Sequence, residues 1–278
     1  MLIDAHSHLN FAAYNSDRDE VIKRSLDNNV WMLNIGTNLQ TSKKAVEIAE
    51  KYSQGVYAAI GLHPINLDTG LVRMKVDKLE GSHFEKEFDF EKYKELAQSK
   101  KVKAIGEIGL DYYWKPKTTR KKELFKQKQK ELLLEELKLA KDLNLPVIFH
   151  CRMAHQDLIE FLKERGEIRP TKAVAHGFVG NLDELKTYLK FGFYIGFNGI
   201  IFKKIEGINL GENIKKTPLD RILIETDCPY LVPPQLKKER NEPIFLKYVV
   251  QKIAEIKNID FERVAEITTQ NAKELFKI

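Results

Sequence analysis

Short apolar runs alternate with longer amphipathic stretches along the 278 residues of this chain. A run of four to eight apolar residues between polar segments is typical of a strand that is buried on both faces. Eight such runs occur, and they place expected strands at residues 2–5, 30–35, 56–60, 103–106, 146–149, 172–175, 193–196 and 221–224. Eight buried strands that alternate with helices predict an α/β protein with a single (β/α)8 barrel, the TIM barrel.

Apolar residues recur at spacings of three and four between most of these runs, which indicates amphipathic helices. The clearest helix is expected at about residues 118–144, where Leu133, Leu137 and Ala140 follow this spacing. Further helices are expected at residues 17–29, at 41–51, from Pro243 onward and at 269–276. Thr41 is the expected N-cap of the second of these. Residues 200–216 contain several Gly and Asn, which favours a loop with a short helix.

One stretch does not fit the alternation. Residues 68–90, between the third and fourth expected strands, are too polar for a core, and we expect a surface insertion or lid there. No Gly/Ser-rich or Pro-rich linker divides the chain. Residues 1–278 are therefore expected to form one barrel domain that carries this insertion.

Composition limits what kind of protein this barrel can be. The 43% hydrophobic content suits a large core, and the formal net charge of +6 is weak evidence for an acidic partner. No apolar run approaches the length of a membrane span, and no signal peptide is evident. Two cysteines, Cys151 and Cys228, are too few for a disulfide framework. We therefore expect a cytoplasmic protein with no membrane attachment and no obligate protein partner.

The first apolar run leads into three polar side chains, Asp4, His6 and His8. Because side chains alternate along a strand, these three point to the same side. Two imidazoles roughly 6–7 Å apart along the strand can tilt onto one cation, and Asp4 can stiffen the pair. The alternative is two surface histidines near a frayed terminus. We favour half of a metal site, which needs further ligands from elsewhere in the chain.

Polar residues also follow several later runs, at the point where each expected strand ends. The carboxyl ends of the strands form the functional face of a parallel barrel. The residues at such ends are His63, Glu107, His150, His176 and Asp227. His83 and His155 do not follow a strand, and we expect them at the surface. Each residue alone could be a loop or core residue, but their convergence on one rim favours a single site.

Four histidines and two carboxylates at this rim form a mixed set of nitrogen and oxygen ligands. The set suits Zn²⁺, Mn²⁺ or Fe²⁺, and Mg²⁺ where water completes the coordination. The six candidate ligands are His6, His8, Glu107, His150, His176 and Asp227. Six ligands exceed the four of one tetrahedral site, so two divalent cations that share a carboxylate are expected. Two such cations can activate a water for phosphoryl transfer.

The segments around these residues are similar to those of a known family. The motifs are DAHSH at 4–8, GLHP at 61–64, GEIGLDYY at 106–113, HCR at 150–152, HGF at 176–178, ETDCPYL at 225–231, NEP at 241–243 and ITTQNA at 267–272. In this order they resemble the TatD family of metal-dependent deoxyribonucleases. The resemblance implies a TIM barrel of the amidohydrolase superfamily, one or two metals and exonuclease activity on DNA. The chain departs from the family in residues 68–90 and 233–241, and the first departure concerns substrate entry rather than chemistry.

The resemblance also implies a role for each candidate ligand. The implied ligands of a first metal are His6, His8 and Asp227. The implied ligands of a second metal are His150 and His176. Glu107 is the implied bridge between the two metals. Asp227 can also orient the attacking water or accept its proton, so Asp227 and Glu107 are the expected catalytic residues.

Candidate substrate contacts lie beside these ligands, and each has a structural alternative. Arg152 can bind phosphate through its planar guanidinium, or form an ion pair with a loop carboxylate. The run Tyr112, Tyr113 and Trp114 can stack on bases, or pack within its loop. A basic cluster can contact the phosphate backbone, or form a solvated face, and it comprises Lys115, Lys117, Arg120, Lys121 and Lys122. His63 completes the candidates for substrate binding.

The leading prediction is a hydrolase that uses water activated by divalent metals to cleave DNA phosphodiester bonds, as an exonuclease. The expected substrate is single-stranded DNA or a 3′ end, and the expected cofactors are two cations of Mg²⁺, Mn²⁺ or Zn²⁺. One alternative is an amidohydrolase that acts on a small amide or ester, because the same metals polarise a carbonyl. Another is a nucleic-acid-binding scaffold that has lost catalysis, although no candidate ligand is missing.

Overall fold

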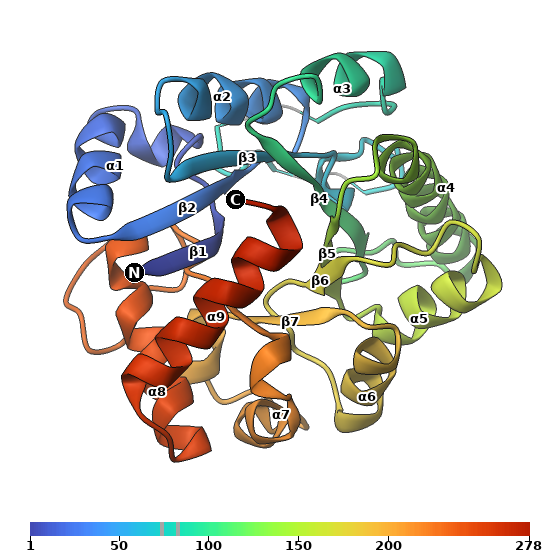
Figure 1. The fold of residues 1–278 in the computed structure, drawn as a ribbon. Helices are drawn as coiled ribbons and strands as arrows, with labels where there is room; N and C mark the ends of the chain where they lie inside the picture. The colour runs from blue at the N-terminus through green and yellow to red at the C-terminus, as the bar shows by residue number, and fades with distance from the viewer. Residues whose placement is uncertain (73–74, 82–83) are drawn as a thin grey trace.

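The strands form one sheet that curves around the centre of the molecule (Figure 1). The computed structural model describes residues 1–72, 75–81 and 84–278. The sheet has eight strands in the order of the sequence, and each neighbouring pair is parallel. They are β1 (Leu2–Ser7), β2 (Val30–Ile35), β3 (Val56–Ile60), β4 (Val102–Asp111), β5 (Val147–Arg152), β6 (Ala173–Ala175), β7 (Tyr194–Phe197) and β8 (Ile222–Ile224).

The sheet closes where β1 meets the chain that follows β8. Ser7 and Cys228 form a parallel bridge. On either side of this bridge, the Asp227 N–H donates to the His6 carbonyl and the His8 N–H donates to the Cys228 carbonyl, both at 2.9 Å. The closure confirms the predicted (β/α)8 barrel, and it brings the first and last candidate ligands together through backbone hydrogen bonds.

Helices cover the outside of the barrel (Figure 1). They are α1 (Arg18–Asp27), α2 (Leu39–Glu50), α3 (Phe90–Leu96), α4 (Thr119–Leu143), α5 (His155–Glu164), α6 (Leu182–Lys190), α7 (Leu210–Lys216), α8 (Leu246–Lys257) and α9 (Phe261–Phe276). A parallel pair of strands needs a crossover connection, and α1 to α7 lie in the seven crossovers, whereas α8 and α9 follow the last strand. Residues 200–216, expected as a loop with a short helix, contain the short α7, and a 3-10 turn at Gly199–Phe202 overlaps their start.

Two helix starts differ from the prediction. The N-cap of α2 is Asn38, whose side chain accepts a hydrogen bond from the Thr41 N–H, and Thr41 is the partner residue of this capping box. The last helix begins at Phe261 instead of residue 269. Pro243 opens a 3-10 turn, Pro243–Phe245, that leads into α8. Propensity alone could not separate Asn38 from Thr41 as caps, because both residue types favour that position.

Small and branched side chains fill the interior of the barrel. This inner core contains Ile3, Ala5, Leu33, Ile35, Ala59, Ala104, Ile148, Val174 and Leu223. Ala272, Leu275 and Phe276 of α9 join the same cluster, and α9 lies across this end of the barrel in Figure 1. A hydrogen bond of 3.1 Å from the Thr269 hydroxyl to the Met1 carbonyl shows that this is the amino end of β1. The functional rim therefore faces away from α9.

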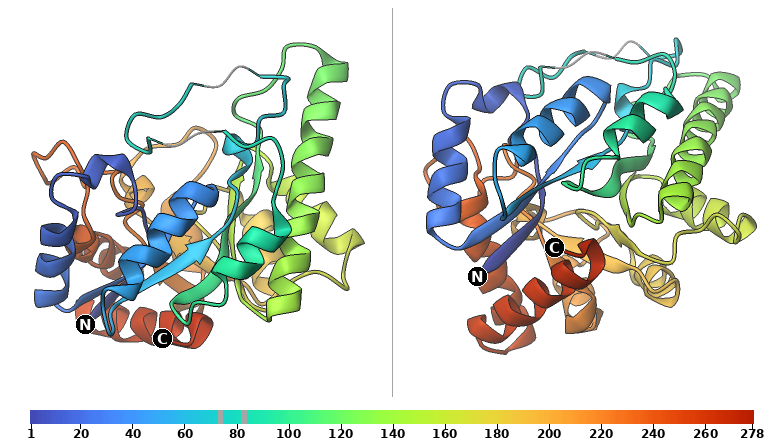
Figure 2. Two further views of the ribbon diagram at one scale, coloured as in Figure 1. Left: turned by 90° about the horizontal axis from the view of Figure 1, so that it is seen from above. Right: turned by 45° about the horizontal axis from the view of Figure 1, so that its top comes forward.

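The segment expected as an insertion lies over this opposite rim (Figure 2, left). The described part of residues 68–89 forms turns and bends, with a bridge between Leu67 and Glu85. The Ala13 N–H donates to the Leu79 carbonyl at 2.9 Å, and the Tyr230 hydroxyl donates to Asp77 Oδ2 at 2.7 Å. Residues 77–80 therefore contact the loops that follow β1 and β8. His83, expected at the surface, is outside the described residues.

Candidate metal centre

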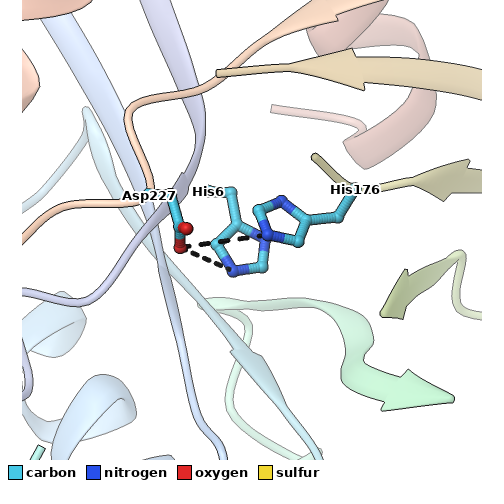
Figure 3. A group of neighbouring side chains, drawn as sticks. All are labelled: His6, His176 and Asp227. Carbon is cyan, nitrogen blue, oxygen red and sulfur yellow. Dashed lines mark ion pairs between the residues drawn. The ribbon is translucent and has the colours of Figure 1, made fainter. Parts of the chain in front are cut away.

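The six candidate ligands converge at the carboxyl rim of the barrel. His6 Nε2 lies 3.1 Å from His8 Nε2 and 3.3 Å from Glu107 Oε2. Asp227 Oδ1 lies 3.4 Å from His8 Nε2, 4.0 Å from His6 Nε2 and 3.9 Å from His176 Nε2. Figure 3 shows His6, His176 and Asp227 pointing toward one another from three different strand ends. The structure thus brings together residues that are up to 221 positions apart in the sequence.

Glu107 occupies the middle of this arrangement. Its Oε2 faces His6, whereas its Oε1 lies 2.8 Å from His150 Nδ1 and 3.8 Å from His176 Nε2. Burial alone would raise the pKa of the Glu107 carboxyl, but the neighbouring His6 and the hydrogen bond from His150 hold it well below its ordinary value. Glu107 is therefore a buried anion with one oxygen on each side of the centre.

Three groups of side chains have the composition and spacing that a metal ion needs. They are His6 with His176 and Asp227, His6 with His8 and Glu107, and His63 with Glu107 and His150. Within each group the candidate ligand atoms lie within 4.8 Å of one another. Imidazole nitrogens mixed with carboxylate oxygens suit divalent transition metals. The residues present therefore fit a metal centre.

In three of the histidines, the ring nitrogen that points away from the centre is hydrogen-bonded, which strengthens this fit. The outward ring nitrogen of each has an acceptor: His8 Nδ1 has the Ile35 carbonyl at 3.0 Å, His150 Nε2 has Asp111 Oδ2 at 3.0 Å and His176 Nδ1 has Glu225 Oε2 at 2.8 Å. When the ring is neutral, the bonded nitrogen carries the proton and the other presents a lone pair to the centre. This tautomer is the one that metal ligation requires.

Asp4 acts on the backbone near the site. Its Oδ1 accepts hydrogen bonds from the backbone N–H groups of His6 at 3.2 Å and Thr226 at 2.9 Å. Its Oδ2 accepts from the Thr226 hydroxyl at 2.5 Å. Burial raises the pKa of Asp4 to about 7, although these hydrogen bonds oppose the shift. Asp4 therefore stiffens β1 where it joins the segment after β8, through the main chain rather than through the imidazoles.

Comparisons with known proteins place this centre in a family. The TatD related DNase family model matches residues 3–277. The chain belongs to this family. It is 39% identical over 280 residues to the "uncharacterized metal-dependent hydrolase YabD" of Bacillus subtilis, with all of both chains covered. It is 32% identical over 282 residues to the "3'-5' ssDNA/RNA exonuclease TatD" of Escherichia coli K12, with 100% of this chain and 99% of that protein covered.

The solved structures agree with the TatD assignment. The crystal structure of YjjV, a TatD homologue from Escherichia coli K12, matches with a TM-score of 0.81 and 28% identity, over 100% of this chain and 98% of that one. A TatD family hydrolase from Entamoeba histolytica matches with a TM-score of 0.79 and 26% identity, over 99% of this chain and 97% of that one. In the described part of the chain, every helix is too short or too polar to cross a membrane. This chain is thus a metal-dependent hydrolase of the TatD family.

Two carboxylates that hold candidate ligands of this centre were not among the predicted site residues. Asp111 and Glu225 contact the far nitrogens of His150 and His176, as described above. Against the lowering effect of burial, these carboxylates help raise the pKa of His150 to about 9 and that of His176 to about 10. Both lie in the motifs GEIGLD and ETD, so position in a motif was the available signal. Gly196 leaves room for Glu225, because a Cβ there would lie 2.0 Å from Glu225 Oε1.

The candidate substrate-binding residues of this TatD protein fall into a buried group and an exposed group. Tyr112 is 5% exposed, so it is closed to a substrate in this structure, whereas Tyr113 and Trp114 are 46% and 52% exposed. Arg152 is also exposed, and its guanidinium lies 3.7 Å from the centre of the Tyr113 ring. His155, expected at the surface, is 6% exposed and the prediction was wrong. It is buried because it lies at the start of α5, on the helix face that packs against the barrel.

Proposed function

We propose that this chain is a nuclease that hydrolyses phosphodiester bonds of single-stranded DNA from the 3′ end. The observation that carries the proposal is the position of Glu107, whose two carboxylate oxygens face different imidazoles within one buried centre. The relative from Escherichia coli that is 32% identical is named a 3'-5' ssDNA/RNA exonuclease, which supports a nucleic acid substrate. A cytoplasmic location and the absence of an obligate protein partner remain predictions.

We assign two divalent cations, Mg²⁺, Mn²⁺ or Zn²⁺, to this centre. His6, His8 and Asp227 would hold the first and His150 and His176 the second, and Glu107 would contribute to both. Such cations supply Lewis acidity that lowers the pKa of water and offsets the charge on a phosphoryl group. His176 also lies beside Asp227, so it can serve either cation.

Asp227 is the carboxylate best placed to accept a proton from water. Its side chain is 20% exposed, in contrast to the almost fully buried Glu107, so a water molecule can reach it. Burial would raise the pKa of Asp227, but the hydrogen bond with His8 and the charge of His176 lower it below its ordinary value. Asp227 is therefore ionised at neutral pH, and it can orient a water and accept its proton.

His63 differs from the other histidines in its hydrogen bonding. Its Nδ1 accepts a hydrogen bond from the Ile65 N–H at 3.0 Å. Burial and the nearby His150 lower the pKa of His63 to about 3, so the ring is neutral. The proton of a neutral ring must then be on Nε2, which faces Glu107 Oε1 at 3.6 Å. Although His63 fits a metal group by distance, this tautomer favours a hydrogen-bond donor to a substrate oxygen over a metal ligand.

The test is a hydrolysis assay on oligonucleotides that carry a label at either the 3′ or the 5′ end. We expect stepwise shortening from the 3′ end, loss of activity with a chelator and recovery when Mg²⁺, Mn²⁺ or Zn²⁺ is added back. Asp227→Asn should abolish the activity, whereas the matched change Asp220→Asn, on an exposed carboxylate, should preserve it.

Small amides and esters are tested in parallel with the oligonucleotides. Turnover of these compounds alone would contradict the nuclease proposal and favour an amidohydrolase. Full metal occupancy without hydrolysis of any phosphodiester or amide would favour a scaffold that binds nucleic acid.

A further inference from the structure

Three large apolar side chains are exposed together near the candidate metal centre. Tyr113 and Trp114 follow β4, and Met153 follows β5; they are 46%, 52% and 64% exposed. The two loops are held side by side, because Asp111 pairs with Arg152 in the sheet and the Tyr112 N–H donates to the Arg152 carbonyl at 2.9 Å. Exposed aromatic residues grouped at one rim are characteristic of a binding surface.

The aromatic side chains have a defined arrangement. The Tyr113 and Trp114 rings meet edge to face, with centroids 5.0 Å apart and an angle of 89° between the planes. The Arg152 guanidinium lies against the Tyr113 ring at 3.7 Å. A planar cation on an aromatic face still has hydrogen-bond donors at its edge for a phosphate. The rings are thus partly ordered before any ligand binds, which reduces the entropy lost on binding.

Positive charge lies on one side of this group, beside Met153. A hollow of about 230 Å³ next to Met153 is lined by Lys115, Lys122 and Lys126, together with Tyr112, Glu123 and Phe125. The first turn of α4 has no acidic residue, although acidic residues are favoured there by the helix dipole. Figure 2 (left) shows the start of α4 and the loop before it rising above the strand ends. The lysine side chains are complementary to the phosphates of a nucleic acid, and the exposed rings beside them are complementary to its bases.

The opposite side of the centre is covered. Phe11 stacks on His8 with ring centroids 4.3 Å apart, and Tyr230 meets Phe11 edge to face at 6.5 Å. The Tyr230 hydroxyl is in turn bonded to Asp77 of the 68–90 segment. By contrast, Arg152 and Met153 directly follow His150 and Cys151 in the chain. Arg152 and Met153 are exposed, as are Tyr113 and Trp114, so the loops after β4 and β5 offer a surface that a long substrate can contact.

We propose that Tyr113, Trp114 and Met153 form a stacking platform for unpaired bases of a single nucleic acid strand, with Arg152 holding a neighbouring phosphate. The proposal rests on the proposed nuclease function for its substrate class. A single strand fits better than a duplex, because the faces of paired bases are covered by their neighbours. The platform would select strands by the presence of bases and not by their sequence.

The test measures binding of a thymidine oligonucleotide, and of an abasic strand of equal length, to protein freed of metal by a chelator. Without metal no hydrolysis disturbs the measurement. Trp114→Ala should weaken binding of the thymidine strand by about five- to a hundredfold, the range for one stacked base, and change binding of the abasic strand less than twofold. Trp114→Phe should restore most of the loss, and Met153→Ala should give a smaller loss.

Leu124→Ala is the matched control, since Leu124 is exposed on α4 but does not line the hollow. It should leave both affinities unchanged. Equal affinity of the wild-type protein for both strands, no loss in Trp114→Ala, or an equal loss on both strands would overturn the platform. Unfolding midpoints of the variants, measured alongside, exclude a folding defect as the cause of a loss.

The outcome is separable from the proposed function. If the protein hydrolyses no nucleic acid but binds the thymidine strand through Trp114, the nuclease proposal fails and the platform stands. If it hydrolyses DNA and Trp114→Ala binds like the wild type, the platform fails and the nuclease proposal stands.

Discussion

The Gln129 side chain holds the backbone of Asp111 from both sides. The Asp111 N–H donates to Gln129 Oε1 at 2.9 Å, and Gln129 Nε2 donates to the Asp111 carbonyl at 3.0 Å. Gln129 is fully buried on α4, and Asp111 in turn contacts His150. Seven residues later on the same helix, Glu136 Oε1 accepts from the Leu62 N–H at 2.8 Å, next to His63. An outer helix thus fixes two strand ends at the centre.

Gln129→Met should destabilise the protein and weaken metal binding. The change keeps the approximate size of the side chain but leaves two buried backbone groups without partners. Each such group costs about 1–3 kcal/mol, so we expect a loss of about 2–6 kcal/mol in the free energy of unfolding. Urea unfolding and calorimetric titration with Mn²⁺ measure the two effects. Gln127→Met, on an exposed residue of α4, is the control, and an equal effect there would contradict the role of Gln129.

Removal of the charge on Asp111 should weaken metal binding through His150. Asp111→Asn retains an acceptor oxygen but no longer stabilises the His150 proton on Nε2. Loss of a partner behind a histidine ligand typically costs 10–100-fold in metal affinity, and we expect a decrease in this range. Glu225→Gln should have the same effect through His176. Calorimetric titration measures both, and wild-type affinity in either variant would show that its carboxylate does not position a ligand.

Glu107→Gln should fold normally, bind at most one metal and lose nearly all hydrolysis. Two divalent cations repel each other, and a neutral amide does little to offset the repulsion. His6→Ala should weaken mainly the first metal, and His150→Ala mainly the second. Calorimetric titration of the three variants separates the cases, with circular dichroism as the control for folding. Two metals bound at wild-type affinity in Glu107→Gln would rule out the bridge.

Gly196→Ala should disturb the centre by displacing Glu225, which contacts His176. The new Cβ would lie 2.0 Å from Glu225 Oε1 and 2.5 Å from its Cδ, and Glu225 is fully buried. Overpacking of this kind costs about 1–3 kcal/mol, and the displaced carboxylate would release His176. Thermal unfolding and metal titration should both show a loss. In Gly166→Ala no atom of the described residues lies within 4 Å of the added Cβ, so this control should show neither.

His155 should make the stability of the fold depend on pH. Its Nε2 donates to the Val179 carbonyl at 3.1 Å, and the Tyr188 hydroxyl lies 3.0 Å from its Nδ1. Burial lowers the pKa of His155 to about 4, below the ordinary value of 6.5. The unfolded chain therefore binds the proton first as the pH falls, and the contribution of His155 is lost between about pH 6.5 and 4. The full shift corresponds to about 3 kcal/mol.

The measurement compares the free energy of unfolding of the wild type with that of His155→Gln across this range. The free energy of unfolding of the wild type minus that of His155→Gln should be constant above about pH 7 and should become smaller as the pH falls toward 4. A difference that does not change with pH would show that His155 titrates alike in the folded and unfolded chains.

Apolar runs predicted the strands well where apolar residues continue to the end of the strand. The expected bounds 30–35 and 56–60 are those of β2 and β3, whereas β4 and β5 extend beyond the prediction to Asp111 and Arg152. These strands continue through polar residues that serve the centre, and an apolar pattern ends at the first of them. The pattern therefore underestimates strands where they become functional.

Contacts between distant elements were harder to predict than the residues that lie together at the candidate centre. His155 is followed by buried residues three, four and seven positions later, Leu158, Ile159 and Leu162, so a helical pattern could have placed it inside. The contact of Gln129 with Asp111 has no such signal, because it depends on where α4 packs against β4. Residue type and order predicted which groups would meet, but not which side chains would hold them in place.

The closure of the barrel also has a consequence for synthesis of the protein. Asp4 is bonded to Thr226, 222 positions away, and Asp227 reaches His8 only when this seam has formed. A polypeptide still emerging from the ribosome carries His6 and His8 from the start, yet lacks the carboxylate that we assign to proton transfer. If the chain is the nuclease that we propose, a copy that ends before Asp227 would therefore be unable to cut nearby nucleic acid, and the activity would arise only once this residue has joined the seam.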